Sequence, residues 1–271
     1  MPYIFPLEAY LSRVGLSNHP APDEDGLHAL HEAQFFTIPF ENFDIQLGRG
    51  IGLEPECLAA KLVYRRRGGY CFELNGLMLL ALRAVGFPAR PLLARVHLGP
   101  SPSGRSHQLN LVEIKDRPWV IDVGFGAGGL RCPMPLEIGY TADGPGWAFR
   151  FVERDPWGIM MQSREGETWK DSYSFDLSHV TDADIRMGNH YTSTSSNCQF
   201  VTSRVASLPQ AGGRTSLLDF TLTRIDGGEK TTRKVPAGSA YLAELASTFN
   251  IELDANYDDL RAVCDQEGVS P

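Results

Sequence analysis

The feature of this 271-residue sequence that most constrains its fold is a glycine pair and a cysteine that open a long apolar run. The segment reads Arg67-Gly68-Gly69-Tyr70-Cys71-Phe72-Glu73-Leu74-Asn75, and apolar residues dominate from there to Gly86. This pattern predicts a turn that leads into a buried helix ending at Gly86. Backbone N–H groups at a helix N-terminus stabilise a thiolate, so Cys71 is a candidate nucleophile. Taken alone, a cysteine in an apolar segment is more commonly a buried structural residue.

A hairpin farther along the chain supplies a candidate base and a candidate acid. Residues 107–114 and 119–123 have the composition of strands, and the intervening Lys115-Asp116-Arg117-Pro118 is typical of a turn. A two-residue turn at either of two positions in this linker places His107 and Asp122 diagonally on one face of the hairpin. A three-residue turn would place them on opposite faces.

These three residues together meet the requirements of an activated thiol. In such a triad the imidazole of His107 takes the proton of the Cys71 thiol, and the carboxylate of Asp122 holds the imidazole in the right tautomer. A histidine satisfied within a strand and an acid near a turn are the ordinary explanations of His107 and Asp122 taken singly. Their combination with a cysteine at a helix start favours a catalytic triad.

The order of helical and strand-like patterns predicts an α+β fold, with helices first, strands next and a mixed tail. We expect boundaries near residues 86 and 200. The expected helices cover residues 6–14, 23–36, 55–66, 71–85, a short segment from Thr181, 240–249 and 257–264. The expected strands include residues 107–114, 119–123, 147–153, 158–162, 200–202 and 218–223.

Composition argues against several classes of function. The chain is 42% hydrophobic and 21% charged, and its net charge of −8 argues against binding nucleic acid or an anionic membrane surface. No apolar run has membrane-spanning length, and the first residues lack a signal-peptide pattern. Five scattered cysteines without a C-x-x-C pair indicate neither a zinc site nor a disulfide framework. We therefore expect a cytoplasmic protein without a metal, and the sequence leaves its oligomeric state open.

Four segments together resemble the arylamine N-acetyltransferase family in its bacterial form. They are the Cys71 segment quoted above, Ile38-Pro39-Phe40-Glu41-Asn42-Phe43, His107-Gln108-Leu109-Asn110 and Asp122-Val123-Gly124-Phe125-Gly126, in the family's order. The resemblance implies transfer of an acetyl group from acetyl-coenzyme A, the co-substrate, to an arylamine or arylhydrazine through a cysteine thioester. It also implies a helical bundle in residues 1–86, a β-barrel-like domain in 87–199 and an α/β lid in 200–271, around a Cys-His-Asp core like that of cysteine proteases.

One segment departs from the family pattern. Residues 189–200 resemble a family motif that usually carries a proline and a serine where this chain has Ser196 and Cys198. The nucleophile is untouched by this departure. The shape of the loop and part of the acceptor pocket are therefore not carried over from the family.

A glycine-rich loop follows the candidate acid, and we refer to it as loop 124–129. Successive backbone N–H groups in such a loop can bind an anion without a lysine, so we expect it to bind coenzyme A. Its members are Gly124, Phe125, Gly126, Ala127, Gly128 and Gly129. Phe125 either stacks on an aromatic amine or packs in the core. The basic residues 65–67 are the second phosphate candidate, although pairing with Glu41 or Glu73 explains such arginines better.

Two other functions fit the same residues. One is a cysteine amidohydrolase like papain or a transglutaminase, which uses the same triad. The other is a non-catalytic protein that binds coenzyme A or an arylamine in a retained pocket. A binding protein would carry no covalent acetyl group on Cys71. A transferase, unlike a hydrolase, would continue to release free coenzyme A only when an amine is present.

Overall fold

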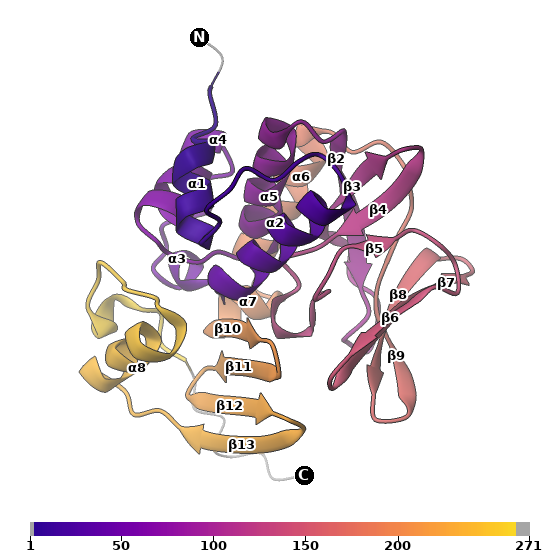
Figure 1. The fold of residues 1–271 in the computed structure, drawn as a ribbon. Coiled ribbons are helices and arrows are strands. Elements are labelled where there is room, and N and C mark those ends of the chain that lie inside the picture. Colours follow the sequence, from indigo (N-terminus) through magenta and orange to yellow (C-terminus); the bar gives the residue numbers. More distant parts are fainter. Residues whose placement is uncertain (1–2, 264–271) are drawn as a thin grey trace.

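The computed structural model describes residues 3–263, and it begins with a group of helices (Figure 1). Pro55 occupies the first helical position, as expected, and the helix continues as a π-helix rather than ending at one turn. Gly15 and Gly86 adopt left-handed conformations that end the first and fifth α-helices. The helices are α1 (Leu7–Val14), α2 (Glu24–Thr37), α3 (Phe43–Gln46), α4 (Pro55–Leu58), the π-helix η1 (Ala59–Tyr64) and α5 (Cys71–Val85).

An antiparallel sheet follows the helices and forms the second part of the fold. Its strand order is β5-β4-β3-β2-β9-β8-β7-β6. Strands β3 and β2 pack against α5, and the other half of the sheet twists away from the helices (Figure 1). The strands are β2 (Ala89–Val96), β3 (Arg105–Ile114), β4 (Arg117–Ile121), β5 (Met134–Pro135), β6 (Thr141–Gly144), β7 (Trp147–Arg154), β8 (Gly158–Glu165) and β9 (Thr168–Phe175); the 3-10 turn η2 (Gly126–Gly128) lies between β4 and β5.

The last part of the chain adds a second sheet that joins the N-terminal helices through one short strand. The order β1-β10-β11-β12-β13 places β1 (Phe40–Glu41) at the edge of this C-terminal sheet. The remaining elements are α6 (Asp182–Thr194), α7 (Gln199–Thr202), β10 (Val205–Gln210), β11 (Gly213–Leu218), β12 (Thr221–Asp226), β13 (Glu229–Lys234), α8 (Ser239–Phe249) and η3 (Tyr257–Asp259). The structure therefore has the α+β architecture that the sequence predicts.

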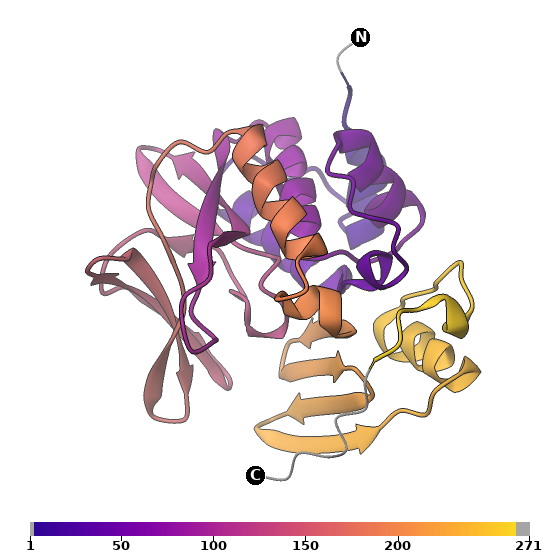
Figure 2. The same ribbon diagram turned by 180° about the vertical axis from the view of Figure 1, so that it is seen from behind.

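Helix α6 lies beside α5 and β3, which Figure 2 shows from behind. A side chain at Gly188 would come within 2.8 Å of Phe72 and 3.1 Å of the Arg105 carbonyl oxygen. The capping residues Thr181 and Asp184 start this helix, as expected, but it runs for 13 residues rather than as a short segment. Its close packing on α5 stabilises the additional turns.

Three predictions for the second half of the chain are wrong. Residues 200–202 form a helical turn, because Asn42 and Gln46 donate to the carbonyl oxygens of Phe200 and Ser203 that a strand would need. Residues 218–223 are two strands, since Asp219 takes a left-handed conformation (φ 52°) between them. Residues 257–264 are not a helix as far as the structure describes them: η3 ends at Asp259, and Cys264 lies outside the described residues.

A buried cluster of charges fixes the turn that precedes α5. The ammonium group of Lys61 lies 2.8 Å from carboxylate oxygens of both Asp44 and Glu73. Arg67 donates two hydrogen bonds to Glu41, and Glu73 accepts the backbone N–H of Tyr70 at 3.1 Å. Because Tyr70 caps α5, this ionic cluster determines where the helix begins and therefore where Cys71 lies.

Replacing Lys61 by methionine should destabilise the protein by about 3–5 kcal/mol at neutral pH, because two buried carboxylates lose their shared cation. Burial raises the pKa of Glu73 and Lys61 lowers it, so the variant should raise this pKa further. A carboxyl group with a raised folded pKa contributes stability below its unfolded pKa, and this contribution is lost as the pH rises. The destabilisation should therefore shrink as the pH falls toward about 4.3, the ordinary glutamate pKa.

Denaturant unfolding at neutral and acidic pH measures both effects. Arg117→Met is the matched control, because it breaks an exposed pair with Glu137 and should cost less than about 1 kcal/mol. Equal losses in the two variants would show that the ionic cluster does not hold the turn.

Candidate active site

Cys71 is the first residue of α5 and is almost completely buried. The two preceding glycines are needed for close packing rather than for unusual backbone angles. A side chain at Gly68 would meet the Pro39 carbonyl oxygen at 2.3 Å, and one at Gly69 would meet Glu73 at 2.8 Å. The glycine pair thus lets the turn pack against β1 and α5, and the cysteine emerges at the helix N-terminus as the sequence predicts.

The hairpin of β3 and β4 places His107 and Asp122 on one face. Asn110 lies opposite Ile121, which is the register given by a tight turn at Lys115 and Asp116. Both turn residues have positive φ values, 49° and 62°. The His107 ring nitrogen Nε2 lies 2.8 Å from Asp122 Oδ2, and both side chains are buried. His107 and Asp122 therefore lie on one face of the hairpin, which confirms the prediction from strand parity.

The carboxylate of Asp122 is held from several sides. Its second oxygen, Oδ1, accepts hydrogen bonds from Asn75 Nδ2 at 2.9 Å and from the Gly124 N–H at 3.0 Å. Burial alone would raise the pKa of Asp122, but the charge of His107 and these hydrogen bonds lower it below the ordinary value. Asp122 is thus built to remain ionised, and its other oxygen holds the His107 ring by a hydrogen bond.

A helix N-terminus is expected to lower the pKa of a thiol, but the pKa of the Cys71 thiol is raised. Burial raises its pKa, and this effect outweighs the N–H groups of Gln108 and Phe72, which lower it. The sulfur lies 3.8 Å from the Ser106 carbonyl oxygen, and within the described residues it makes no hydrogen bond to His107. Burial therefore opposes the charged form of this thiol, and the candidate base for its proton is Nδ1 of His107, the ring nitrogen that does not face Asp122.

The sequence did not predict a role for Asn75, whose side chain joins α5 to β3 and to the segment that follows β4. Besides its bond to Asp122, it donates to the Gln108 carbonyl oxygen at 2.6 Å and accepts from the Val123 N–H at 3.0 Å. The sequence could have indicated a role for Asn75, because this residue lies four positions after Cys71. A polar residue one turn along an apolar helix lies on the same face as the nucleophile. His31 and Tyr173 were also missed: His31 lies 3.3 Å from the Asp122 carbonyl oxygen, and Tyr173 packs against the His107 ring.

Loop 124–129 borders a cavity of about 330 Å³. Gly126 has a φ of 67°, and Phe125 packs against both His107 and Tyr173, with ring centroids 5.0 and 4.9 Å away. Three arginines from different elements line the same cavity: Arg131, Arg164 and Arg214. Phe125 therefore packs against the imidazole, while Ala127 and Gly128 of the loop line a space whose wall carries three arginines and one acid, Glu165.

The basic residues 65–67 do not form a phosphate site as a group. Arg67 is buried and bound to Glu41, as the sequence favours, whereas Glu73 pairs with Lys61. Cys198, in the segment that departs from the family pattern, begins α7 and is half-buried. In residues 3–263 no group of three or more histidine, cysteine, aspartate or glutamate side chains could hold a metal ion. No helix of the described part is long and apolar enough to cross a bilayer.

Replacing Gly124 by alanine should damage the site, because the added carbon would lie 2.5 Å from Asn75 Nδ2 and 2.9 Å from Cys71 Cα. We expect a loss of about 1–3 kcal/mol in stability from overpacking, together with slower alkylation of Cys71 by iodoacetamide. Gly128→Ala in the same loop is the control, since its nearest neighbour would be 4.0 Å away. Thermal unfolding and alkylation rates that are the same in both variants would contradict this close approach.

Comparison with known proteins places this site in a family. A family model for N-acetyltransferases matches residues 23–257. The chain is 39% identical to an arylamine N-acetyltransferase / N-hydroxyarylamine O-acetyltransferase of Salmonella typhimurium, over 82% of this chain and 80% of that protein. It is 35% identical to the arylamine N-acetyltransferase of Escherichia coli, over 92% of this chain and 89% of that protein.

Solved structures agree with this assignment. The arylamine N-acetyltransferase of M. smegmatis superposes with a TM-score of 0.90 at 30% identity, covering 97% of this chain and 100% of that one. The enzyme of Mycobacterium marinum, solved in complex with CoA, gives 0.85 at 30% identity, covering 90% of this chain and 92% of that one. With the fold, the family model and the curated relatives in agreement, this chain belongs to the arylamine N-acetyltransferase family.

Proposed function

We propose that this protein transfers an acetyl group from acetyl-coenzyme A to the nitrogen of an arylamine or arylhydrazine, through a thioester on Cys71. The observation that carries this proposal is the buried His107–Asp122 pair beside a cysteine at a helix start. The names of the relatives and the CoA complex of the M. marinum enzyme support it.

The first half of the reaction makes the thioester. His107 accepts the proton of Cys71, and the thiolate attacks the acetyl carbonyl carbon of acetyl-coenzyme A. Backbone N–H groups, including that of Cys71 at the start of α5, hold the negative charge that develops on the carbonyl oxygen. The bond between the carbonyl carbon and the coenzyme A sulfur then breaks, and His107 returns the proton to the leaving thiolate. Asp122 stabilises the imidazolium in between.

The second half transfers the acetyl group to the amine. The amine nitrogen attacks the thioester carbon, His107 takes the proton that the nitrogen loses, and the Cys71 sulfur leaves as the thiol. An amide is more stable than a thioester, so the main task of the protein is to exclude water from the intermediate. The burial of all three side chains serves this task.

Coenzyme A is proposed to bind along loop 124–129. The cavity beside this loop is lined by Arg131, Arg164 and Arg214, whose charges suit phosphate groups. Gly126 lies next to Ser207 of β10, so the C-terminal sheet borders the loop. We propose that residues 200–271 act as the lid of a site built by residues 1–86 and 87–199. A cytoplasmic location is proposed as well, because a catalytic thiol stays reduced there.

Intact-mass measurement with acetyl-coenzyme A tests the thioester. We expect one added acetyl group, on Cys71 by peptide mapping, and its loss when an aromatic amine is supplied. Cys57→Ser is the control, because Cys57 is an exposed thiol and its removal should leave acetylation unchanged. Acetyl on another cysteine with Cys71 unmodified would contradict the mechanism. Continued release of coenzyme A beyond one equivalent without an amine would favour a hydrolase, and an unmodified protein would favour a binding function.

Gly126→Val should weaken the use of acetyl-coenzyme A, because a branched side chain is strained at a positive φ and would press on Ser207 and Phe40, which would displace the loop from the cavity. Cys71 should still react with iodoacetamide at the wild-type rate. The measurement is the donor concentration that half-saturates acetylation, beside the alkylation rate. Gly104→Val is the control, since nothing lies within 4 Å of a side chain there. Unchanged donor saturation, or a parallel collapse of alkylation, would give the loop a structural role only.

A further inference from the structure

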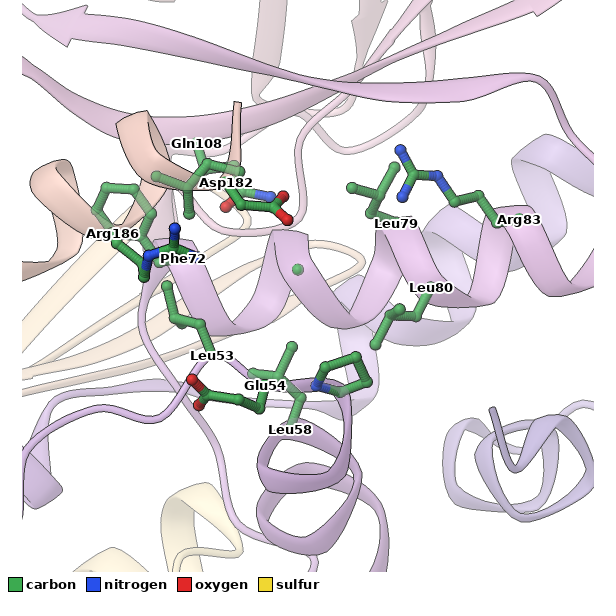
Figure 3. A pocket seen from close by; sticks show the side chains of 13 residues that line it. Leu53, Glu54, Leu58, Phe72, Leu79, Leu80, Arg83, Gln108, Asp182 and Arg186 are labelled. Atoms are coloured by element: carbon green, nitrogen blue, oxygen red, sulfur yellow. The ribbon is translucent and has the colours of Figure 1, made fainter. Parts of the chain in front are cut away.

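A second cavity, of about 290 Å³, lies along α5 between this helix, α4 and α6 (Figure 3). It is separate from the cavity at loop 124–129, and the two share no lining residue. Phe72 and Gln108 lie at one end, and Leu80 and Arg83 lie at the other. Because side chains alternate along a strand, Gln108 projects to the face of β3 opposite His107. The same backbone thus presents a catalytic residue on one side and the wall of this cavity on the other.

Helix α5 forms one wall of this cavity, and a glycine at position 76 leaves space in that wall. Phe72, Gly76, Leu80 and Arg83 follow one another along one face of the helix, and all of them line the cavity. A glycine inside a helix costs about 1 kcal/mol relative to alanine, so its presence at position 76 calls for a reason. A side chain there would project toward Leu58, whose nearest carbon would be 3.1 Å away. Gly76 is partly exposed within a helical segment whose neighbours on both sides are buried.

A buried polar side chain at one end of the cavity lacks a partner. Gln108 is only 1% exposed and lines the cavity. Its backbone carbonyl accepts from Asn75, but within residues 3–263 its side-chain amide makes no hydrogen bond. Its amide nitrogen and oxygen are not among the fully buried side-chain atoms without a partner in the described residues, so they face the space of the cavity, where they offer a donor and an acceptor side by side. A primary carboxamide presents the complementary pair and can form two hydrogen bonds with it.

The rest of the lining, which includes the ring of Phe72, suits a neutral and apolar body. The walls are apolar, from residues that include Leu53, Leu58, Phe72, Leu79, Leu80 and Ile185. Two acids and two bases lie at the rim: Glu54, Asp182, Arg83 and Arg186. These charges balance, so the rim attracts neither an anion nor a cation overall. A pocket of this volume with apolar walls and one convergent polar group has the features of a small-molecule site.

We propose that this cavity binds a small neutral aromatic primary carboxamide, with the ring between the leucines and Phe72 and the amide paired with Gln108. The site is distinct from the acetyl-transfer site, and this inference does not depend on the proposed function. Phe72 directly follows Cys71, and the Gln108 carbonyl holds Asn75, so a ligand bound here touches the supports of the candidate triad without entering it.

The probe is 2-naphthamide, titrated into the wild-type protein while the Gln108 side-chain amide signals are followed by NMR. We expect saturable binding that shifts these signals and that persists after Cys71 has been alkylated. Gly76→Leu and Ile185→Trp fill the cavity from two different walls and should each weaken binding by about tenfold or more. Met187→Trp is the matched control on the same helix, because Met187 is 72% exposed and lies outside the cavity; it should bind like the wild type.

The isosteric anion 2-naphthoate separates amide recognition from simple apolar binding, and we expect it to bind at least about tenfold more weakly, because a carboxylate cannot donate to Gln108. The proposal is overturned by an absence of saturable binding, by equal binding of naphthoate, or by loss of binding on Cys71 alkylation. It is also overturned if a folded cavity-filling variant, verified by its melting temperature, binds like the wild type. Acetyl transfer by the wild-type protein is measured separately, so failure here leaves the proposed function untouched.

Discussion

The structure depends on one buried carboxylate, that of Asp122. This group receives hydrogen bonds from Asn75 of α5, from the Gly124 N–H and from His107 of β3. It therefore ties the helical part, the central sheet and loop 124–129 together at a single point. A buried anion needs such partners to remain charged, and here each partner belongs to a different element of the candidate site. The helical part and the central sheet thus meet at the carboxylate that holds the His107 ring.

Burial gives Cys71 and Asp122 opposite responses, and this contrast determines the proposed chemistry. The pKa of Asp122 is lowered because His107 and its hydrogen bonds outweigh desolvation, whereas that of Cys71 is raised because desolvation wins. Burial therefore opposes the charged form of the thiol but not that of the carboxylate, and the imidazole bound to Asp122 is the candidate group to take the thiol proton. A second network, the ionic cluster of Lys61, Glu73, Asp44, Glu41 and Arg67, holds the turn that presents the cysteine.

The sequence predicted the parts of this architecture that depend on local patterns. The helix after Cys71, its end at Gly86 and the register of His107 and Asp122 follow from periodicity, glycine chemistry and strand parity. One error lies where distant residues decide: Asn42 and Gln46 bind the carbonyl groups that turn 200–202 into a helix. Another is local, because the left-handed backbone of Asp219 splits an apparently continuous strand. The roles of Asn75 and Lys61 also depend on partners far away or on the next turn, which no single segment reveals.

The most direct test of the account is the rate of acetyl transfer by Asp122→Asn, with Asp116→Asn as the control in the exposed turn of the same hairpin. Asparagine keeps the size of the side chain but offers an amide that favours the wrong imidazole tautomer. The comparable change in a serine protease lowers kcat by about 10⁴-fold. We predict a loss of roughly three to four decades for Asp122→Asn, unchanged turnover for Asp116→Asn, and folded protein in both cases. A loss of only a few-fold in Asp122→Asn would contradict the claim that this carboxylate orients His107 for catalysis.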